Sequence, residues 1–201
     1  MSYQCCAEDQ YPLTLFLMAR PSGRVYELGT AIQNYINDRF ELFPKGELPP
    51  LHMTVERITV ESEAEIRRAS QIIGPCVAEY SAFEMRVTGF SCFGSPHKSV
   101  NLRVERDRVL EALAIDLNER LMRAGFEVRD SIGDYEYHIS LVNPNFALRE
   151  WSESEYEEAC MIVKDAETAV MWPVDELELW YPWYLPSLRI EAVYPLATGL
   201  R

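Results

Sequence analysis

The feature that most constrains the fold is a four-residue pattern that occurs twice, far apart in the chain. A histidine, an apolar residue, a hydroxyl residue and another apolar residue follow one another at 52–55 (HMTV) and at 138–141 (HISL). The chain has three histidines, and in a sequence of average composition two such matches would arise by chance about once in five hundred chains. Each copy follows a segment with helical periodicity. The repeat therefore predicts two related lobes that face each other.

Strand alternation converts this pattern into a candidate catalytic site. Residues two apart on a strand point to the same face, so His52 shares a face with Thr54, and His138 shares one with Ser140. An imidazole pKa near roughly 6.5 lets one neutral ring accept a proton while a protonated ring donates one. The hydroxyls can donate hydrogen bonds to phosphoryl oxygens. These four side chains suit phosphoryl chemistry without a metal, and we predict that they are catalytic.

Periodicity and turn residues give the other elements. The pattern predicts strands at 12–21, 51–60, 82–94, 99–107, 135–144, 174–182 and 187–196, and helices at 23–40, 62–80, 107–125 and 152–167. Capping boxes are expected at Ser62 with Glu65 and at Ser152 with Glu155, and a helix stop is expected at Gly125. No linker or low-complexity segment interrupts this order. Residues 1–201 therefore read as a single domain, in which 12–80 form one strand-helix-strand-helix half.

Two helices carry clear apolar stripes. The core-facing residues expected in the first and third helices are Val25, Leu28, Ile32, Tyr35 and Ile36, and Val109, Leu110, Leu113, Leu117 and Leu121.

The amino-acid composition limits which binding partners and which cellular location can be expected. The formal net charge is -13, which argues against an extended nucleic-acid surface, because such surfaces are usually basic. A small phosphorylated ligand in a local basic pocket stays possible. The five cysteines form no CxxC pair and no zinc-ligand spacing, a pattern that indicates a reducing compartment. No long apolar segment is present, so we expect a cytoplasmic monomer without membrane contact.

Several residues are candidates for holding the substrate. Arg103 and Asn101 share one face of a strand, Arg57 follows the first motif, and an aromatic turn at 180–184 could stack a nucleobase. Ordinary surface solvation and core packing are the alternatives for these residues. Arg20 and Lys98 are further cations near predicted strand ends. The predicted substrate-binding residues are Arg103, Asn101, Arg57, Tyr137, Tyr181, Trp183 and Tyr184.

A metal site is the rival use of the histidines. Glu56 has the strand parity of His52, and Glu136 has that of His138, so either carboxylate could bind a cation or orient an imidazole. Solvated strand ends are the simpler expectation for both, and we predict no catalytic metal. His97 lies in a polar turn and is expected to be a solvated loop residue.

Both motifs, in this order of elements, resemble the two-histidine phosphoesterase superfamily, which includes 2′-5′ RNA ligase-like proteins and cyclic nucleotide phosphodiesterases. The similarity of layout covers nearly the whole chain, and Ser140 replaces the threonine of many members but keeps the hydroxyl. The resemblance implies a bilobal α+β fold, with two antiparallel sheets, helices outside, and a central cleft on a pseudo-two-fold axis. It also implies catalysis without metal or cofactor on 2′,3′-cyclic phosphates or 2′-5′ linkages.

We therefore expect a phosphodiesterase that acts on nucleotides or short RNA ends. Two alternatives stay open. The first keeps the fold but ligates RNA ends or trims RNA 3′ ends, a reaction that a strongly basic cleft rim would favour. The second is a non-enzymatic nucleotide-binding protein, and the intact histidines and hydroxyls of both motifs argue against it.

Overall fold

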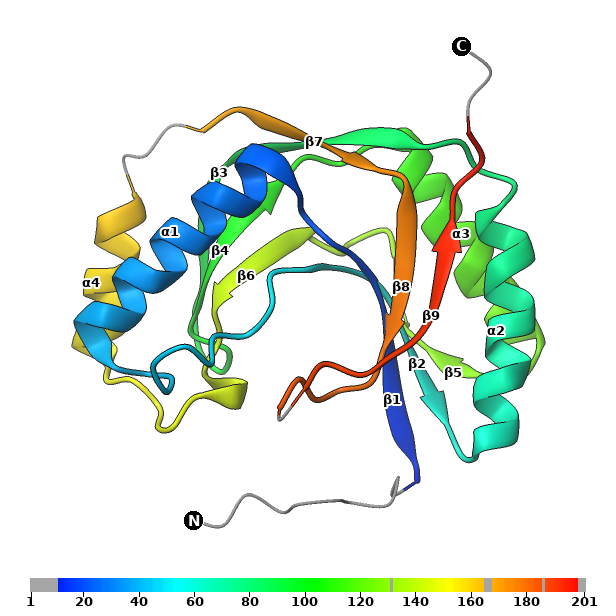
Figure 1. The fold of residues 1–201 in the computed structure, drawn as a ribbon, viewed down its shortest axis with the longest axis horizontal. Helices are drawn as coiled ribbons and strands as arrows, with labels where there is room; N and C mark the ends of the chain where they lie inside the picture. Colours follow the sequence, from blue (N-terminus) through cyan, green and yellow to red (C-terminus); the bar gives the residue numbers. More distant parts are fainter. Residues whose placement is uncertain (1–10, 131, 165–167, 186, 199–201) are drawn as a thin grey trace.

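The computed structural model describes residues 11–130, 132–164, 168–185 and 187–198 (Figure 1). Its strands are β1 (Leu13–Ala19), β2 (Met53–Val60), β3 (Phe83–Phe93), β4 (Ser99–Val104), β5 (Glu127–Val128), β6 (His138–Val142), β7 (Val170–Val174), β8 (Glu176–Trp180) and β9 (Ile190–Pro195). Its helices are α1 (Gly23–Phe40), α2 (Glu63–Val77), α3 (Arg108–Arg123), the 3-10 turn η1 (Pro144–Phe146) and α4 (Glu153–Val163). Each predicted helix and strand has a counterpart, and β5, β7 and η1 are additional. Residues 165–167 of the last predicted helix lie outside the described residues.

The strands form an antiparallel, strongly curved sheet in the order β7-β3-β4-β6-β2-β1-β8-β9, with β5 paired to β2. The α+β class and the antiparallel pairing are confirmed. The two expected sheets meet where β2 pairs with β6, through the residues Met53 and Ile139. Each motif strand therefore stands at the inner edge of its half, next to the other.

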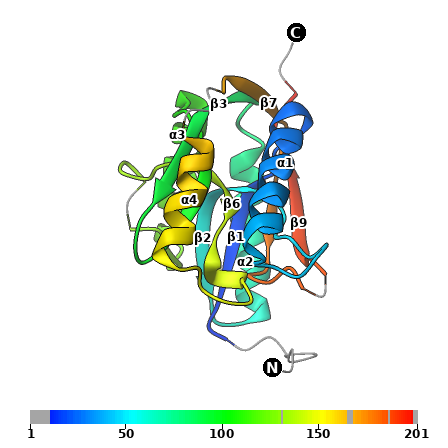
Figure 2. The ribbon, with the colours of Figure 1, turned by 90° about the vertical axis from the view of Figure 1, so that its left-hand side faces the viewer.

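The helices lie on the outside of the curved sheet (Figure 1). Helices α2 and α3 pack together beside β2, β5 and β9, whereas α1 packs against β6 and β7, and α4 packs against β3 and β4. Figure 2 shows α1 and α4 side by side over their half. The expectation that 12–80 form one half is therefore wrong for α1, which crosses to the half that contains β6.

Close packing explains where α1 lies. A Cβ at Gly29 would approach Leu51 Cδ1 to 2.7 Å and Leu141 Cδ2 to 3.4 Å. Glycine thus lets α1 sit tightly on the strand that carries the second motif. The buried positions of α1 are Val25, Gly29, Gln33, Ile36, Asn37 and Phe40.

The apolar stripes are confirmed except at their margins. Val25 and Ile36 are buried, but Tyr35 is 59% exposed, because the buried face of α1 is centred on Gly29 and Gln33. In α3 the four predicted leucines are buried, whereas Val109 in the first turn is 36% exposed.

The helix ends follow the predicted signals closely. The Ser152–Glu155 capping box has both of its hydrogen bonds. At α2 the Ser62 side chain accepts from Glu65 N, but the Glu65 carboxylate bonds Glu61 N in place of Ser62 N. Gly125 follows α3 with φ of +88°, a left-handed conformation that ends the helix.

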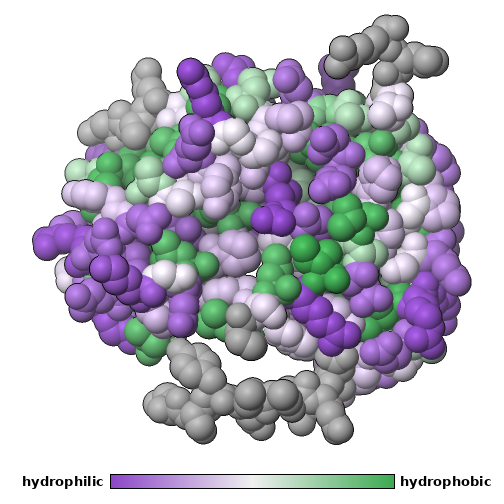
Figure 3. Space-filling model, viewed as in Figure 1, coloured by the Kyte–Doolittle hydropathy of each residue, from purple (hydrophilic) through white to green (hydrophobic). Residues whose placement is uncertain are grey.

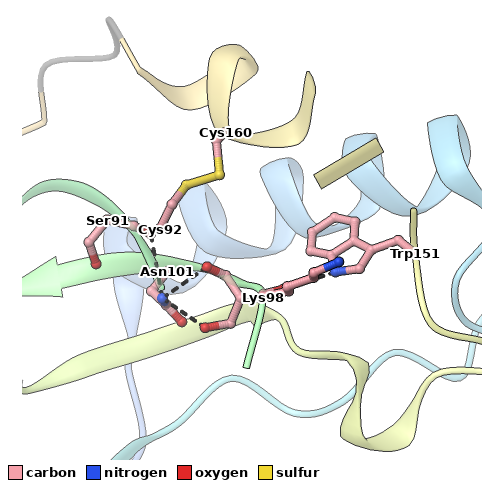
Figure 4. The surroundings of a disulfide bond; sticks show 7 residues. Ser91, Cys92, Lys98, Asn101, Trp151 and Cys160 are labelled. Carbon is pink, nitrogen blue, oxygen red and sulfur yellow. Dashed lines mark hydrogen bonds between the residues drawn. A yellow bond between two sulfur atoms is a disulfide. The ribbon is translucent and has the colours of Figure 1, made fainter. Parts of the chain in front are cut away.

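A disulfide joins Cys92 of β3 to Cys160 of α4 (Figure 4). The number and spacing of the cysteines gave no indication of this pair, which ties α4 to the β3–β4 hairpin. The reducing compartment inferred from the cysteines stays a prediction.

The face drawn in Figure 3 is largely hydrophilic, with hydrophobic residues gathered over the β8–β9 hairpin. Among the described residues, no helix has the length and apolarity needed to cross a bilayer.

Candidate active site

The pairing of β2 with β6 brings the two histidine motifs together. Met53 pairs with Ile139 in antiparallel register, and both side chains are fully buried in the core. Their neighbours on either side must then point to the opposite, concave face. Continuing this register places His52 toward Ser140 and Thr54 toward His138. The pseudo-two-fold arrangement of imidazoles and hydroxyls follows from this one residue pair.

All four motif side chains line one pocket of about 310 Å³. That volume lies at the small end of the range for ligand pockets. Strand β1, the loop before β2, the segment after β6 and the β8–β9 turn supply the rest of the wall. The other lining residues are Phe16, Met18, Pro49, Pro50, Leu141, Asn143, Asn145, Trp180, Tyr181, Pro182, Trp183, Tyr184 and Leu188.

The two imidazoles are held in the same way. His52 Nδ1 lies 2.8 Å from the carbonyl oxygen of Pro50, and His138 Nδ1 lies 2.7 Å from that of Glu136. A carbonyl oxygen can only accept, so Nδ1 must carry the hydrogen in both rings. Nε2 is therefore the ring nitrogen available to a ligand at each site.

Aromatic rings enclose both histidines. Trp180 packs edge-on against His52 with centroids 5.2 Å apart, and Phe93 packs edge-on against His138 at 4.8 Å. Burial is the largest cause that lowers the pKa of each histidine below its ordinary value of 6.5. The backbone hydrogen bonds oppose this change, and so does the Glu136 carboxylate at His138. Both rings thus favour the neutral form that accepts a proton at Nε2.

The two hydroxyls are not equivalent. Ser140 Oγ donates to Asn101 Oδ1 at 3.0 Å, whereas Thr54 Oγ1 donates to a weak acceptor, Met18 Sδ, at 3.3 Å. The Asn101 amide is fully buried, and its Nδ2 donates to Ser91 O, Ser99 O and Ser99 Oγ (Figure 4). Thr54 can therefore turn and donate to a ligand, while Ser140 presents its lone pairs. This differs from the expectation that both hydroxyls donate.

Asn101 was predicted to bind substrate directly, and the structure places it behind Ser140. It pairs with Ser140 across β4 and β6 but does not line the pocket. Its contact with a ligand would therefore be indirect, through the serine hydroxyl.

Glu56 departs from its expected place as a solvated neighbour of the first motif. The register of β1 and β2 shifts between Leu17 and Met18, so that one extra residue enters β2 after Thr54. Such a bulge reverses the side-chain parity beyond it, and Glu56 is fully buried away from the pocket.

The Glu56 carboxylate is held by several donors. It accepts from Asn118 Nδ2 at 2.7 Å, from Arg129 N at 3.2 Å and from Arg57 N at 2.8 Å. The Arg129 side chain also lies 3.9 Å away as an ion pair. A buried Glu56 bound in this way is not available to orient His52 or to hold a cation there. Glu136, in contrast, is exposed as expected.

The predicted aromatic residues of the β8–β9 turn do line the pocket. Tyr181 and Trp183 have ring centroids 5.3 Å apart. Tyr181 is nearly fully buried and is fixed from behind, because Arg189 stacks on its ring and donates to its hydroxyl at 2.7 Å. Trp183 and Tyr184 are half-buried, so their rings are accessible from the pocket side.

The other predicted substrate residues lie outside the lining. Tyr137 is 1% exposed, because it has the core parity of Ile139, and burial raises its pKa to about 12. Arg103 is opposite His138, but its guanidinium donates to Thr88 on β3. Arg57 is exposed opposite Phe16. Arg103 therefore has the face expected from the sequence, but its side chain extends toward Thr88 and not into the pocket.

The remaining cations and the third histidine also lie outside the pocket lining. Arg20 pairs with Glu178 at 3.5 Å, and Lys98 pairs with Glu153 at 2.8 Å. His97 is exposed in the β3–β4 turn. Within the described part of the chain, no group of three or more His, Cys, Asp and Glu side chains is arranged to hold a metal.

Sequence reasoning missed several pocket residues. Asn143 and Asn145 follow the second motif directly, and Asn143 Oδ1 accepts from Asn145 N at 3.0 Å. Two amides so close to a catalytic strand were a usable signal. Phe16 and Met18 gave none, because they read as ordinary strand residues whose pocket-facing side is set by the pairing of β1 with β2 and β8. Trp180, which belongs to the aromatic turn expected at 180–184, also lines the pocket.

The fold matches solved structures along nearly its whole length. A Thermus thermophilus protein, TT0787, gives a TM-score of 0.68 at 17% identity, covering 94% of this chain and 100% of that one. Apo LigT of E. coli gives 0.59 at 16%, covering 94% and 100%. Usb1 of Kluyveromyces marxianus gives 0.52 at 14%, covering 92% and 99%. No curated protein matches the chain in sequence.

A family model provides the assignment that these distant structural matches alone do not. The model described as the 2′-5′ RNA ligase superfamily matches residues 23–182. That range includes both histidine motifs and the aromatic turn as far as Pro182. The chain belongs to the 2′-5′ RNA ligase superfamily, among the two-histidine phosphoesterases.

Proposed function

We propose that this protein is a metal-independent phosphodiesterase that opens 2′,3′-cyclic phosphates or cleaves 2′-5′-linked nucleotides, with His52 and His138 as general acid and base. One observation carries the proposal. Both imidazoles use Nδ1 for a backbone carbonyl, and both line one pocket, so two Nε2 atoms are available to the same ligand.

The reaction then needs one proton movement at each histidine. A neutral imidazole accepts a proton through Nε2 from the attacking water as its oxygen bonds to phosphorus. The other ring, protonated, donates through Nε2 to the ribose oxygen as its bond to phosphorus breaks. Thr54 donates to a non-bridging oxygen as charge develops there, and Ser140, oriented by Asn101, accepts from a donor of the substrate or the attacking water.

The nucleoside occupies the aromatic side of the pocket. Trp183 and Tyr184 present accessible rings, and stacking of a base on such rings contributes about 1–3 kcal/mol. Tyr181, which also lines the pocket, packs against Trp183. A relative of the same fold, E. coli LigT, has been crystallised with 3′-AMP, which agrees with a nucleotide-sized ligand here.

Hydrolysis is favoured over RNA-end ligation. A ligase must hold two RNA ends, and their phosphates call for a basic surface. Among the described residues, the pocket wall has no lysine or arginine, and the chain has a formal net charge of -13.

The test is hydrolysis of a panel in excess EDTA, comprising the 2′,3′-cyclic nucleotides, a 2′-5′ dinucleotide and ADP-ribose cyclic phosphate. The wild type is compared with the His52→Ala/His138→Ala double variant. Turnover that survives EDTA and is lost in the double variant supports the proposal and identifies the linkage. If no member of the panel is hydrolysed, the substrate assignment is wrong.

A further inference from the structure

The described residues that form the walls of the active-site pocket carry no formal charge, apart from any proton taken up by the two imidazoles. Among the residues that the structure describes, the lining consists of apolar and aromatic side chains, the Thr54 and Ser140 hydroxyls, two asparagine amides and the two imidazoles, and the aromatic side chains include the phenols of Tyr181 and Tyr184. It includes no Lys, Arg, Asp or Glu. Within the described lining, a positive charge can therefore come only from a protonated His52 or His138.

The nearest cations are directed elsewhere. Arg103 shares the concave face with His138, but its Nη2 donates to Thr88 O at 3.0 Å on the far strand. The Arg20 guanidinium pairs with the Glu178 carboxylate. Arg57 is opposite Phe16 and exposed, outside the lining. The ligand thus meets uncharged donors from Thr54, Asn143 and Asn145, which bind anions less strongly than an arginine fork.

We propose that this pocket selects ligands with one negative charge at a single phosphodiester, and rejects dianionic monoesters and ligands with further phosphates. The part of this inference that concerns turnover rests on the proposed function. The part that concerns binding rests on the pocket lining alone. One imidazolium balances a monoanion, which leaves the occupied pocket neutral. A second negative charge would be desolvated without a partner in a protein of net charge -13.

The same charge balance favours release of the product. Water adds to the phosphorus of a cyclic phosphate, the bond from phosphorus to one ribose oxygen breaks, and that oxygen takes a proton. The product monoester has a second ionisable oxygen with a pKa of roughly 6, so above that pH it releases a proton and becomes a dianion. The pocket has no second cation for it, and the product dissociates readily.

The turnover experiment uses three adenosine 2′,3′-cyclic phosphates that differ only at the 5′ position. These carry a hydroxyl, an O-acetyl group that adds bulk without charge, and a phosphate. At pH 7.5 and low salt, kcat/KM should be at least tenfold lower for the 5′-phosphate than for the 5′-O-acetyl compound. Equal or faster turnover of the 5′-phosphate would overturn the inference while leaving the phosphodiesterase activity intact.

The binding experiment does not depend on turnover. By calorimetry at pH 7.5, the methyl phosphodiester of 3′-AMP, a monoanion, should bind at least fivefold more tightly than 3′-AMP itself. Such a preference without turnover of any cyclic phosphate would refute the proposed function but support the charge selectivity. Tighter binding of 3′-AMP, or binding of neither ligand, would overturn the selectivity.

A matched pair of variants tests whether charge causes the discrimination against the 5′-phosphate. Asn145 lines the pocket and is exposed, so Asn145→Lys adds a cation there and Asn145→Met adds similar length without charge. The lysine variant should reduce the discrimination against the 5′-phosphate several-fold, and the methionine variant should retain it. Equal discrimination in both variants would show that charge is not its origin.

Discussion

Met53 of β2 lies opposite Ile139 of β6, and this pair joins the two halves of the sheet and carries both histidine motifs on its flanks. Both side chains are fully buried. The pair explains how two segments far apart in the chain form one site, since each apolar residue between a histidine and a hydroxyl anchors its motif in the core. Thr54, His138 and Ser140 lie on paired strands and His52 directly precedes β2, so the sheet fixes their direction more firmly than a loop would.

Single replacement of either histidine should abolish turnover. His52→Ala and His138→Ala each remove a group that transfers a proton, and kcat/KM should fall by about 10²–10⁴-fold. Circular dichroism should show the same secondary structure, because both rings face the pocket. The matched control is His97→Ala in the exposed β3–β4 turn, which should retain nearly the wild-type rate. Near-normal activity in either motif variant would contradict the two-histidine mechanism.

The pH dependence of kcat/KM should be bell-shaped, with its maximum on the acidic side of about pH 6.5. Burial lowers the pKa of both histidines. As the pH rises through the pKa of the acid, the proton to be donated is lost. As the pH falls through the pKa of the base, its acceptor site is filled. A maximum well above pH 7.5 in the profile of the free enzyme would contradict this assignment.

A variant can show which limb belongs to His138. The Glu136 carboxylate raises the pKa of His138, so Glu136→Gln should move one limb of the profile to lower pH. A shift of the alkaline limb identifies His138 as the acid, and a shift of the acidic limb identifies it as the base. Glu127→Gln, at an exposed position on β5, is the control and should move neither limb.

Asn101 should act on catalysis only through Ser140. Loss of the hydrogen bond between them frees the serine hydroxyl, and Asn101→Ala should lower kcat by roughly tenfold. In a Ser140→Ala background the same change should have no further effect on kcat. Ser99→Ala, which removes one acceptor of the Asn101 amide, should give a smaller decrease. Additive effects of Asn101→Ala and Ser140→Ala on kcat would show that Asn101 acts by another route.

Much of this molecule follows from local sequence patterns. The helices and the motif strands could be predicted because their periodicity, caps and turns are local, and the faces of His52, Thr54, His138 and Ser140 follow from alternation. The crossing of α1 to the other half depends on close packing at Gly29, which no local pattern encodes. The direction of Arg103 toward Thr88 is likewise a tertiary property.

Glu56 shows where alternation fails. Its parity with His52 holds only for an unbroken strand, and the register shift opposite Leu17 and Met18 reverses it. A bulge is created by the partner strand as much as by the bulged one, so β2 alone could not reveal it. The result is a buried carboxylate that joins β2 to α3 and to the segment after β5.

Removal of the Glu56 carboxylate should lower the free energy of unfolding. Glu56→Ala leaves Arg129, with a side chain 10% exposed, as a buried charge without its partner, and it also deprives Asn118 Nδ2 of one acceptor. Loss of one member of a buried ion pair typically costs about 3–5 kcal/mol in the free energy of unfolding. Urea denaturation measures this change. The exposed Glu136→Ala should change stability by less than about 0.5 kcal/mol, and a similarly small effect of Glu56→Ala would show that the buried network contributes little to stability.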